Sequence, residues 1–230
     1  MIRAIKTAKY KLLQFLLMFT AMFAVSCEEY LPDGGLYELT PEAVDLGLPS
    51  GVKWATFNVG ATKPEEYGGY YAWGETEEKS DYSWSTYKWC KGSETSMTKY
   101  CTDSSYGTVD NKTVLDLEDD VAHVNWGGSW RMPTRAEQDE LRENCAWIWT
   151  TLNGVNGYKV ISKTNGNSIF LPAAGCREGA GGGYRGSGGF YWSSSLYSSY
   201  SYNAYCLYSG YYDGSYGRRF YGLSVRPVSE

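Results

Sequence analysis

The sequence contains a single histidine, His123, and this scarcity excludes several kinds of site. A catalytic triad with a histidine base, or a metal site built from several histidines, would have to use this one residue. The chain also has no H-E-x-x-H motif and no C-x-x-C pair, which argues against a zinc site. We therefore predict that His123 is a packed or surface residue, that the chain is not an enzyme, and that it needs neither a metal nor a cofactor.

An excess of basic residues is missing as well. The chain has 21 lysines and arginines against 26 aspartates and glutamates, which gives a formal net charge of −5. A nucleic-acid partner would favour a basic face, so we expect no such partner. The tail is locally basic at Arg185, Arg218 and Arg219, which we predict to be solvated loop charges.

Only one apolar run approaches the length of a membrane span, and it lies at the N-terminus. Leu12–Val25 follows several lysines and an arginine, and is short for a span, which is typical of a signal peptide. The run ends in Ala24-Val25-Ser26-Cys27, which resembles a bacterial lipobox. We predict that residues 1–27 are a lipoprotein signal with Cys27 as the lipidated residue. An ordinary signal peptide and an uncleaved anchor remain alternatives.

The residues after Cys27 suggest where the protein is displayed. Glu28 and Glu29 resemble the acidic export signal of surface lipoproteins in Bacteroides-type bacteria. We predict a tether over residues 28–39 and a ligand-binding domain over 40–230. A lipid would then hold this domain at the outer membrane, on the cell surface.

Five cysteines remain after Cys27, and an exported compartment permits disulfides between them. Cys90 and Cys101 bracket a polar loop and are the candidate pair. The odd count leaves at least one thiol free or paired elsewhere, and spacing alone leaves the other connectivities open.

One helix has a specific start signal. Thr134 and Glu137 have the spacing of a capping box, and Pro133 forbids helix just before it. We predict a helix of about three turns that buries Ala136, Leu141 and Cys145 on one face.

A second, shorter helix is predicted over 116–124. Its acidic residues offer oxygen ligands for calcium but lack the spacing of an EF-hand, so a solvated helix face is the preferred interpretation. These acidic residues are Asp116, Glu118, Asp119 and Asp120.

Strand patterns occur on both sides of these helices. Apolar positions broken by Gly and Pro predict strands over 44–59, and a hairpin is expected where 158–163 and 168–172 flank Asn165-Gly166. The polar, tyrosine-rich stretch 75–108 is predicted to be a long irregular insertion.

The stretch 189–228 has almost no Val, Ile or Leu, and tyrosine recurs there every two or three residues. Ser, Gly, Asn and Asp lie between the tyrosines, and this mixture is typical of binding loops. We assign Tyr191, Trp192, Leu207 and Val225 to the interior, and we expect a flexible glycine-rich loop over 175–189 and a further loop over 211–217. The candidate ligand-binding residues of segment 190–221 are Tyr197, Tyr200, Tyr202, Asn203, Tyr205, Tyr208, Tyr211, Tyr212, Asp213, Tyr216, Arg218, Phe220 and Tyr221.

Four stretches together, 119–141, 168–179, 190–196 and 222–228, resemble the Fibrobacter major-paralogous-type domain of Bacteroides lipoproteins. That family is similar to C-type-lectin-like folds and to formylglycine-generating enzymes. The resemblance implies an α+β, C-type-lectin-like domain with short antiparallel strands, one or two helices and much irregular structure.

The tail also resembles the variable proteins of diversity-generating retroelements, in which adenine-targeted mutagenesis converts Asn codons into Tyr, Ser, Asp, Gly, Cys, Phe and others. This resemblance implies a displayed receptor that binds an extracellular protein or glycan. Its constant frame would be Trp192, Ala204, Leu207, Gly222 and Arg226, and Cys206 would be one of its variable positions.

Three other interpretations remain as alternatives, and one of them is a purely structural cell-envelope protein with no ligand. A carbohydrate-binding adhesin of fixed specificity has the same composition, because Tyr and Trp stack on sugar faces. A metal-dependent oxidase related to formylglycine-generating enzymes is the third, but Cys176 and Cys206 lack a recognisable motif of that family around them. The Glu-Pro-Asn and Trp-Asn-Asp motifs of calcium-dependent lectins are absent too, so the fold resemblance confers neither activity.

Overall fold

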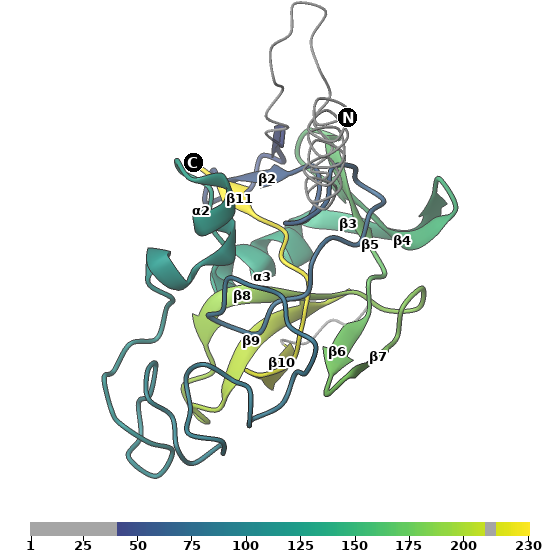
Figure 1. Ribbon diagram of the computed structural model, residues 1–230. Coiled ribbons are helices and arrows are strands. Elements are labelled where there is room, and N and C mark those ends of the chain that lie inside the picture. The colour runs from purple at the N-terminus through teal and green to yellow at the C-terminus, as the bar shows by residue number, and fades with distance from the viewer. Residues whose placement is uncertain (1–40, 210–214) are drawn as a thin grey trace, which may run out of the picture. The chain divides into compact units, whose positions relative to one another are not determined.

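The computed structural model describes residues 41–209 and 215–230, and it is mostly β-structure with few helices (Figure 1). Short strands form small antiparallel sheets, which agrees with the predicted α+β class. Residues Pro41–Glu230 form one compact unit. The predicted signal peptide, lipidated Cys27 and tether lie outside the described residues. Within the described ranges, no helix is long and apolar enough to cross a bilayer.

The first sheet joins the two ends of the domain. It has the order β1-β2-β11, and both pairings are antiparallel. Its strands are β1 (Ala43–Asp45), β2 (Lys53–Ala55) and β11 (Val228–Ser229). The prediction of strands over 44–59 is confirmed, although each strand is short.

The second sheet contains the predicted hairpin. Its order is β3-β4-β5, from β3 (Cys145–Leu152), β4 (Val155–Ser162) and β5 (Ser168–Pro172). Between β4 and β5 only Gly166 takes a positive φ, so a loop of 163–167 replaces the expected two-residue turn. The tight turn lies one hairpin earlier, where Asn153 and Gly154 both have positive φ, 48° and 84°.

The third sheet carries most of the tyrosine-rich tail. Its order is β10-β9-β8, from β8 (Phe190–Leu196), β9 (Asn203–Tyr208) and β10 (Ser215–Arg218). The loop predicted over 211–217 is therefore a strand from Ser215 onward, and 211–214 lie outside the described residues. Part of the glycine-rich stretch forms a hairpin of β6 (Cys176–Glu178) and β7 (Gly181–Gly183) (Figure 1).

Helix α3 (Arg135–Asn144) begins as predicted. The Glu137 amide donates to Thr134 Oγ1 at 3.3 Å, and the Thr134 amide donates to the Glu137 carboxylate at 2.7 Å. The predicted buried face is wrong at Ala136, which is exposed, and Cys145 already begins β3. Leu141 is buried as predicted, and the helix also buries Glu137 and Gln138.

Those two polar residues of α3 are buried because each has a partner. Glu137 forms an ion pair with Arg131 at 2.7 Å, and Gln138 Nε2 donates to the carbonyl of Tyr191 at 3.1 Å. Hydrogen bonds of this kind remove most of the cost of burying polar groups. A hydrophobic pattern alone could not have revealed this face.

Strand β8 lies between two apolar clusters. Trp192 packs in a cluster with Trp73 and Tyr100, whereas the neighbouring Tyr191 packs in another with Leu46. Successive side chains of a strand point to opposite faces, so one strand serves both clusters. Leu207 and Val225 are buried as well. All four tail residues assigned to the interior are therefore confirmed.

Arg226 holds several strands together from inside the core. Its guanidinium donates to Asn58 Oδ1 at 2.8 Å and to the carbonyls of Ala55, Thr56 and Phe170. Burial lowers the pKa of Arg226 to about 10, so the side chain remains charged at neutral pH. One side chain thus connects the C-terminal segment to β2 and β5.

The predicted disulfide between Cys90 and Cys101 is not formed, and both thiols are free. Cys90 Sγ donates to the carbonyl of Trp84 at 3.2 Å, whereas Cys101 Sγ donates to that of Asp103 at 3.1 Å. Each thiol has its own backbone partner, so bracketing the same polar loop does not bring the two together.

Candidate ligand-binding site

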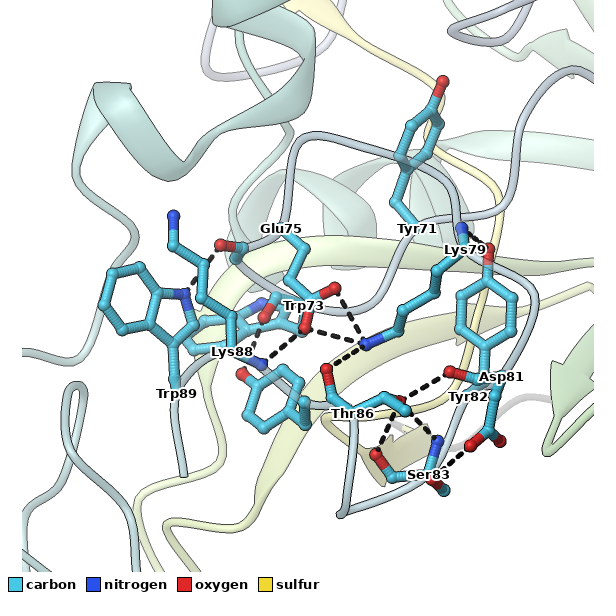
Figure 2. Close-up of polar contacts among 12 residues, drawn as sticks. Tyr71, Trp73, Glu75, Lys79, Asp81, Tyr82, Ser83, Thr86, Lys88 and Trp89 are labelled. Atoms are coloured by element: carbon cyan, nitrogen blue, oxygen red, sulfur yellow. Dashed lines mark hydrogen bonds and ion pairs between the residues drawn. The ribbon is translucent and has the colours of Figure 1, made fainter. Parts of the chain in front are cut away.

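The insertion 75–108 contains neither a helix nor a named strand, as predicted, and polar side chains hold it in place. The buried carboxylate of Glu75 accepts from Lys79 Nζ at 2.9 Å and from the Lys88 amide at 2.8 Å (Figure 2). Lys79 Nζ also donates to the carbonyl of Thr86 at 3.1 Å. These hydrogen bonds give the insertion a defined conformation.

A second polar group fixes the end of this insertion. The Lys99 ammonium lies 2.6 Å from Asp119, 2.8 Å from Asp116 and 3.2 Å from Glu118, and the Tyr100 hydroxyl donates to Asp119 at 2.6 Å. Among the described residues these carboxylates are the one group with the geometry of a cation site. The Lys99 ammonium already neutralises part of their charge.

The expected solvated helix face is wrong at two of its four acidic residues, since Asp119 and Asp120 are buried. They lie at the junction of the 3-10 helix η1 (Leu117–Asp119) and helix α2 (Val121–Trp126). Asp120 caps α2 by accepting from the amides of Ala122 and His123. His123 is half-buried, with Nδ1 3.2 Å from the carbonyl of Trp130.

Arg219 joins the insertion to the tail. Its guanidinium donates to the carbonyls of Lys99 (3.0 Å), Tyr100 (3.1 Å) and Ser201 (2.8 Å). It also lies 4.9 Å from the Trp73 ring centre. The expectation of a solvated charge is wrong here, because Arg219 is 0% exposed; its neighbour Arg218 is exposed as expected.

The surface above this junction carries a group of six tyrosines in ring contact, which we call the tyrosine cluster. Its members are Tyr106, Tyr197, Tyr200, Tyr202, Tyr205 and Tyr216.

Tyr197 is at the centre of one half of the cluster. Its ring stacks on Tyr216 at 4.2 Å and meets the edge of Tyr205 at 5.1 Å. Tyr205 and Tyr216 are cross-strand partners on β9 and β10, so the ladder sets their spacing. The guanidinium of Arg135, at the start of α3, lies 5.0 Å from the Tyr205 ring centre.

Tyr200 continues the cluster toward the insertion. Its ring lies 6.0 Å from Tyr197 and 5.7 Å from Tyr202, and Tyr106 contacts both Tyr200 and Tyr202. The insertion is also bound to this turn where Thr102 Oγ1 donates to the carbonyl of Ser198 at 3.1 Å. Tyr106 was not predicted as a site residue, because only the folded chain brings it to the tail.

The cluster remains open to solvent. Tyr216 is 50% exposed and Tyr200 is 42% exposed, while the other four members are half-buried. The rings are therefore accessible, and their contacts restrict how they move.

Other predicted site residues lie elsewhere. Asn203 and Phe220 are buried, so their assignment to the binding surface is wrong. Asn203 is enclosed where its backbone closes the turn from Tyr197, and Phe220 packs against Trp84.

Tyr208 and Tyr221 are half-buried and make other aromatic contacts. Tyr208 stacks on Phe190 at 4.4 Å, and Tyr221 packs against Phe220 at 4.8 Å. Tyr211, Tyr212 and Asp213 lie outside the described residues.

The two cysteines that the oxidase alternative would use are poor nucleophiles. Burial raises the pKa of the Cys206 thiol to about 12, and it also raises the pKa of Cys176. Since the thiolate is the reactive and metal-binding form, both residues are largely inert at neutral pH.

No family model, curated sequence or solved structure matches the chain.

We predict that Arg219→Met lowers the free energy of unfolding by at least about 3 kcal/mol, because three buried carbonyls lose their donor at about 1–3 kcal/mol each. Urea unfolding measures this, with the exposed neighbour in Arg218→Met as the matched control, for which we expect a change within about 0.5 kcal/mol. Equal stability of the two variants would contradict the proposed role of Arg219.

The Lys99 group predicts a dependence of stability on acid. Hydrogen bonds from Lys112 and Lys99 lower the pKa of Asp116 from 3.8 to about 2. Because folding lowers this pKa, the carboxylate stabilises the folded state above pH 4 and loses this effect as the pH falls toward 2. We expect Asp116→Asn to flatten the fall of the melting temperature in that range, and Glu77→Gln, an exposed control, to leave it unchanged. Identical slopes for Asp116→Asn and the unsubstituted chain would contradict the prediction.

Proposed function

We propose that the protein is a binding protein whose tyrosine cluster contacts an extracellular protein or glycan. The observation that carries this proposal is the continuous ring contact of six tyrosines, two of them about half-exposed, at a junction fixed by Arg219. Contiguous exposed aromatic surface is typical of interaction sites rather than of inert surface.

The chemistry of the cluster suits such a role. Tyr rings bring large contact areas with few rotamers to freeze, and each carries a hydroxyl that gives direction to the contact. Arg218 lies two residues from Tyr216 on β10, so both side chains leave the same face of the strand. An occupant would therefore meet flat rings beside a charged donor.

We further propose that the domain has a C-type-lectin-like fold and that a lipid on Cys27 holds it on the outer membrane surface. The lipid anchor is supported by the lipobox-like sequence Ala24-Val25-Ser26-Cys27. The fold is supported by the four stretches that resemble the Fibrobacter major-paralogous-type domain. They fall on α2 and α3, on β5 and β6, on β8, and on the segment that leads into β11.

We propose that the tail is diversified, because the residues of the constant frame and the tyrosines of the cluster differ in burial. The frame residues Trp192, Ala204, Leu207 and Arg226 are buried, whereas the cluster tyrosines are half-buried or exposed. Substitution of an exposed ring leaves the core intact.

An adhesin of fixed specificity is the alternative. It is favoured by the burial of Asn203, Cys206 and Phe220, because diversification would also have to change these packed positions.

Tyr200→Ala and Tyr216→Ala are each expected to weaken binding at least tenfold, since a central aromatic contact contributes about 2 kcal/mol. The free energy of unfolding should fall by no more than about 1.5 kcal/mol, the contribution of a surface ring pair. Glycan and extracellular-protein arrays identify the occupant, and surface plasmon resonance then measures its affinity. Tyr184→Ala removes a 62% exposed tyrosine outside the cluster and serves as the control. Equal affinities for all three variants would exclude the cluster as the site.

Sequencing the same locus in sibling strains distinguishes the two functions. Diversification predicts differences concentrated at Tyr197, Tyr200, Tyr202 and Tyr216, with the neighbouring Arg219 unchanged. A nearby near-copy of the coding sequence and a reverse transcriptase gene should accompany them. An invariant cluster without these elements would support the fixed adhesin.

A further inference from the structure

Two small hollows adjoin on the surface beside the β6–β7 hairpin, and no residue that lines them belongs to the tyrosine cluster. Their volumes are about 280 and 200 Å³, and they share Tyr70 and Arg177 in their walls. Both are smaller than the roughly 300–1,000 Å³ pockets that hold drug-sized ligands. The two adjoining hollows therefore suit a small polar unit, of about the size of a monosaccharide, that extends across both.

The hollows contain two arginines that converge on one tyrosine. The Arg177 guanidinium lies 5.0 Å from the Tyr70 ring centre, and Arg185 Nη2 lies 3.2 Å from the Tyr70 hydroxyl. That hydroxyl donates to the buried carbonyl of Ala174 at 2.6 Å, which fixes the tyrosine. The two cations are thus positioned on a rigid residue.

Neither arginine has a carboxylate within ion-pair distance among the described residues. By contrast, Arg131, Arg135 and Arg142 all form ion pairs with carboxylates. Arg177 is half-buried and Arg185 is exposed, so both can be reached from solvent. Their charge is available to a bound anion.

The other charges near the hollows already have partners. Lys79 points to Glu75 and Thr86, and Asp81 points to Ser83 (Figure 2). Glu178 follows Arg177 on β6, so its side chain leaves the other face of the strand, and it lines neither hollow.

Glu78 is the remaining charge in the wall, and it makes the lining mixed. One of its oxygens accepts from the Tyr70 amide at 2.7 Å. A carboxylate has further lone pairs to accept hydrogen bonds and would repel a simple anion. The wall therefore offers donors to an anion and acceptors to hydroxyl groups.

The glycines of β7 leave space in this wall because they carry no side chains. A Cβ on Gly182 would lie 3.3 Å from Arg177 Cδ and 3.0 Å from the carbonyl of Cys176. A Cβ on Gly181 would meet only the carbonyl of Glu178, at 3.6 Å, and Gly183 faces open space. Side chains on this strand would narrow the hollows and push Arg177 aside. The glycine-rich sequence of β7 leaves room for a ligand against the backbone.

We propose that this double hollow binds an acidic monosaccharide unit. Its carboxylate or sulfate would lie between Arg177 and Arg185, which present bidentate donors to such groups. Its hydroxyls would donate to Glu78 and exchange hydrogen bonds with Ser80, which also lines the wall. The site is independent of the tyrosine cluster and of the ligand proposed for it.

Saturation-transfer NMR on the full chain tests the proposal with glucuronate, glucose 6-sulfate and glucose as probes. We expect saturation of one or both acidic sugars and none of glucose, and the comparison of the two assigns the carboxylate or the sulfate. Arg177→Gln and Arg185→Gln should each raise the dissociation constant of the acidic sugar at least tenfold. Arg142→Gln removes an equal charge from α3 and should change it less than twofold.

Several results would overturn the proposal. These are no saturation of either acidic sugar, equal saturation of glucose, unchanged affinity in both hollow variants, or displacement of the sugar by inorganic sulfate at the same affinity as the sugar itself. Arg185 is exposed, so Arg185→Gln keeps the test decisive if Arg177→Gln fails to fold. Tyr200→Ala should leave sugar binding unchanged, which separates this site from the tyrosine cluster.

Discussion

The proposed binding surface depends on a buried positive charge that has no carboxylate partner among the described residues. Arg219 is enclosed by aromatic rings, and a charge in such a place is costly unless every donor finds an acceptor. The carbonyls of Lys99, Tyr100 and Ser201 and the hydroxyl of Tyr87 are those acceptors. The three carbonyls belong to two irregular segments. Satisfying one guanidinium therefore fixes the insertion against the turn between β8 and β9.

The tyrosine cluster follows from this arrangement. Tyr106 comes from the insertion, Tyr200 and Tyr202 from the turn, and Tyr205 and Tyr216 from paired strands. Rings that are held in place before binding lose less conformational freedom when a ligand arrives. The buried Arg219 holds the junction in place, while the rings of the cluster remain open to solvent. Such an arrangement combines a stable scaffold with surface positions that tolerate substitution.

Local signals predicted part of this structure. The capping box of Thr134 follows from the chemistry of helix N-termini, and the interior positions of Tyr191 and Trp192 follow from the preference of aromatic residues for strands. Each of these predictions is confirmed. The failures lie where tertiary contacts decide. Arg218 and Arg219 are adjacent and chemically identical, yet one is exposed and the other fully buried. The hairpin that carries Arg177 lies in a stretch where composition indicated only a flexible loop.

The most direct test of the account is hydroxyl-radical footprinting of the folded protein, read residue by residue with mass spectrometry. The account predicts strong labelling of Tyr200 and Tyr216 and protection of Tyr100 and Tyr191, which are almost completely buried. Labelling of Tyr200 and Tyr216 should fall when a ligand is bound. Protection of Tyr200 and Tyr216 in the free protein, at the level of Tyr100, would contradict the claim that the cluster is an open surface on a stable scaffold.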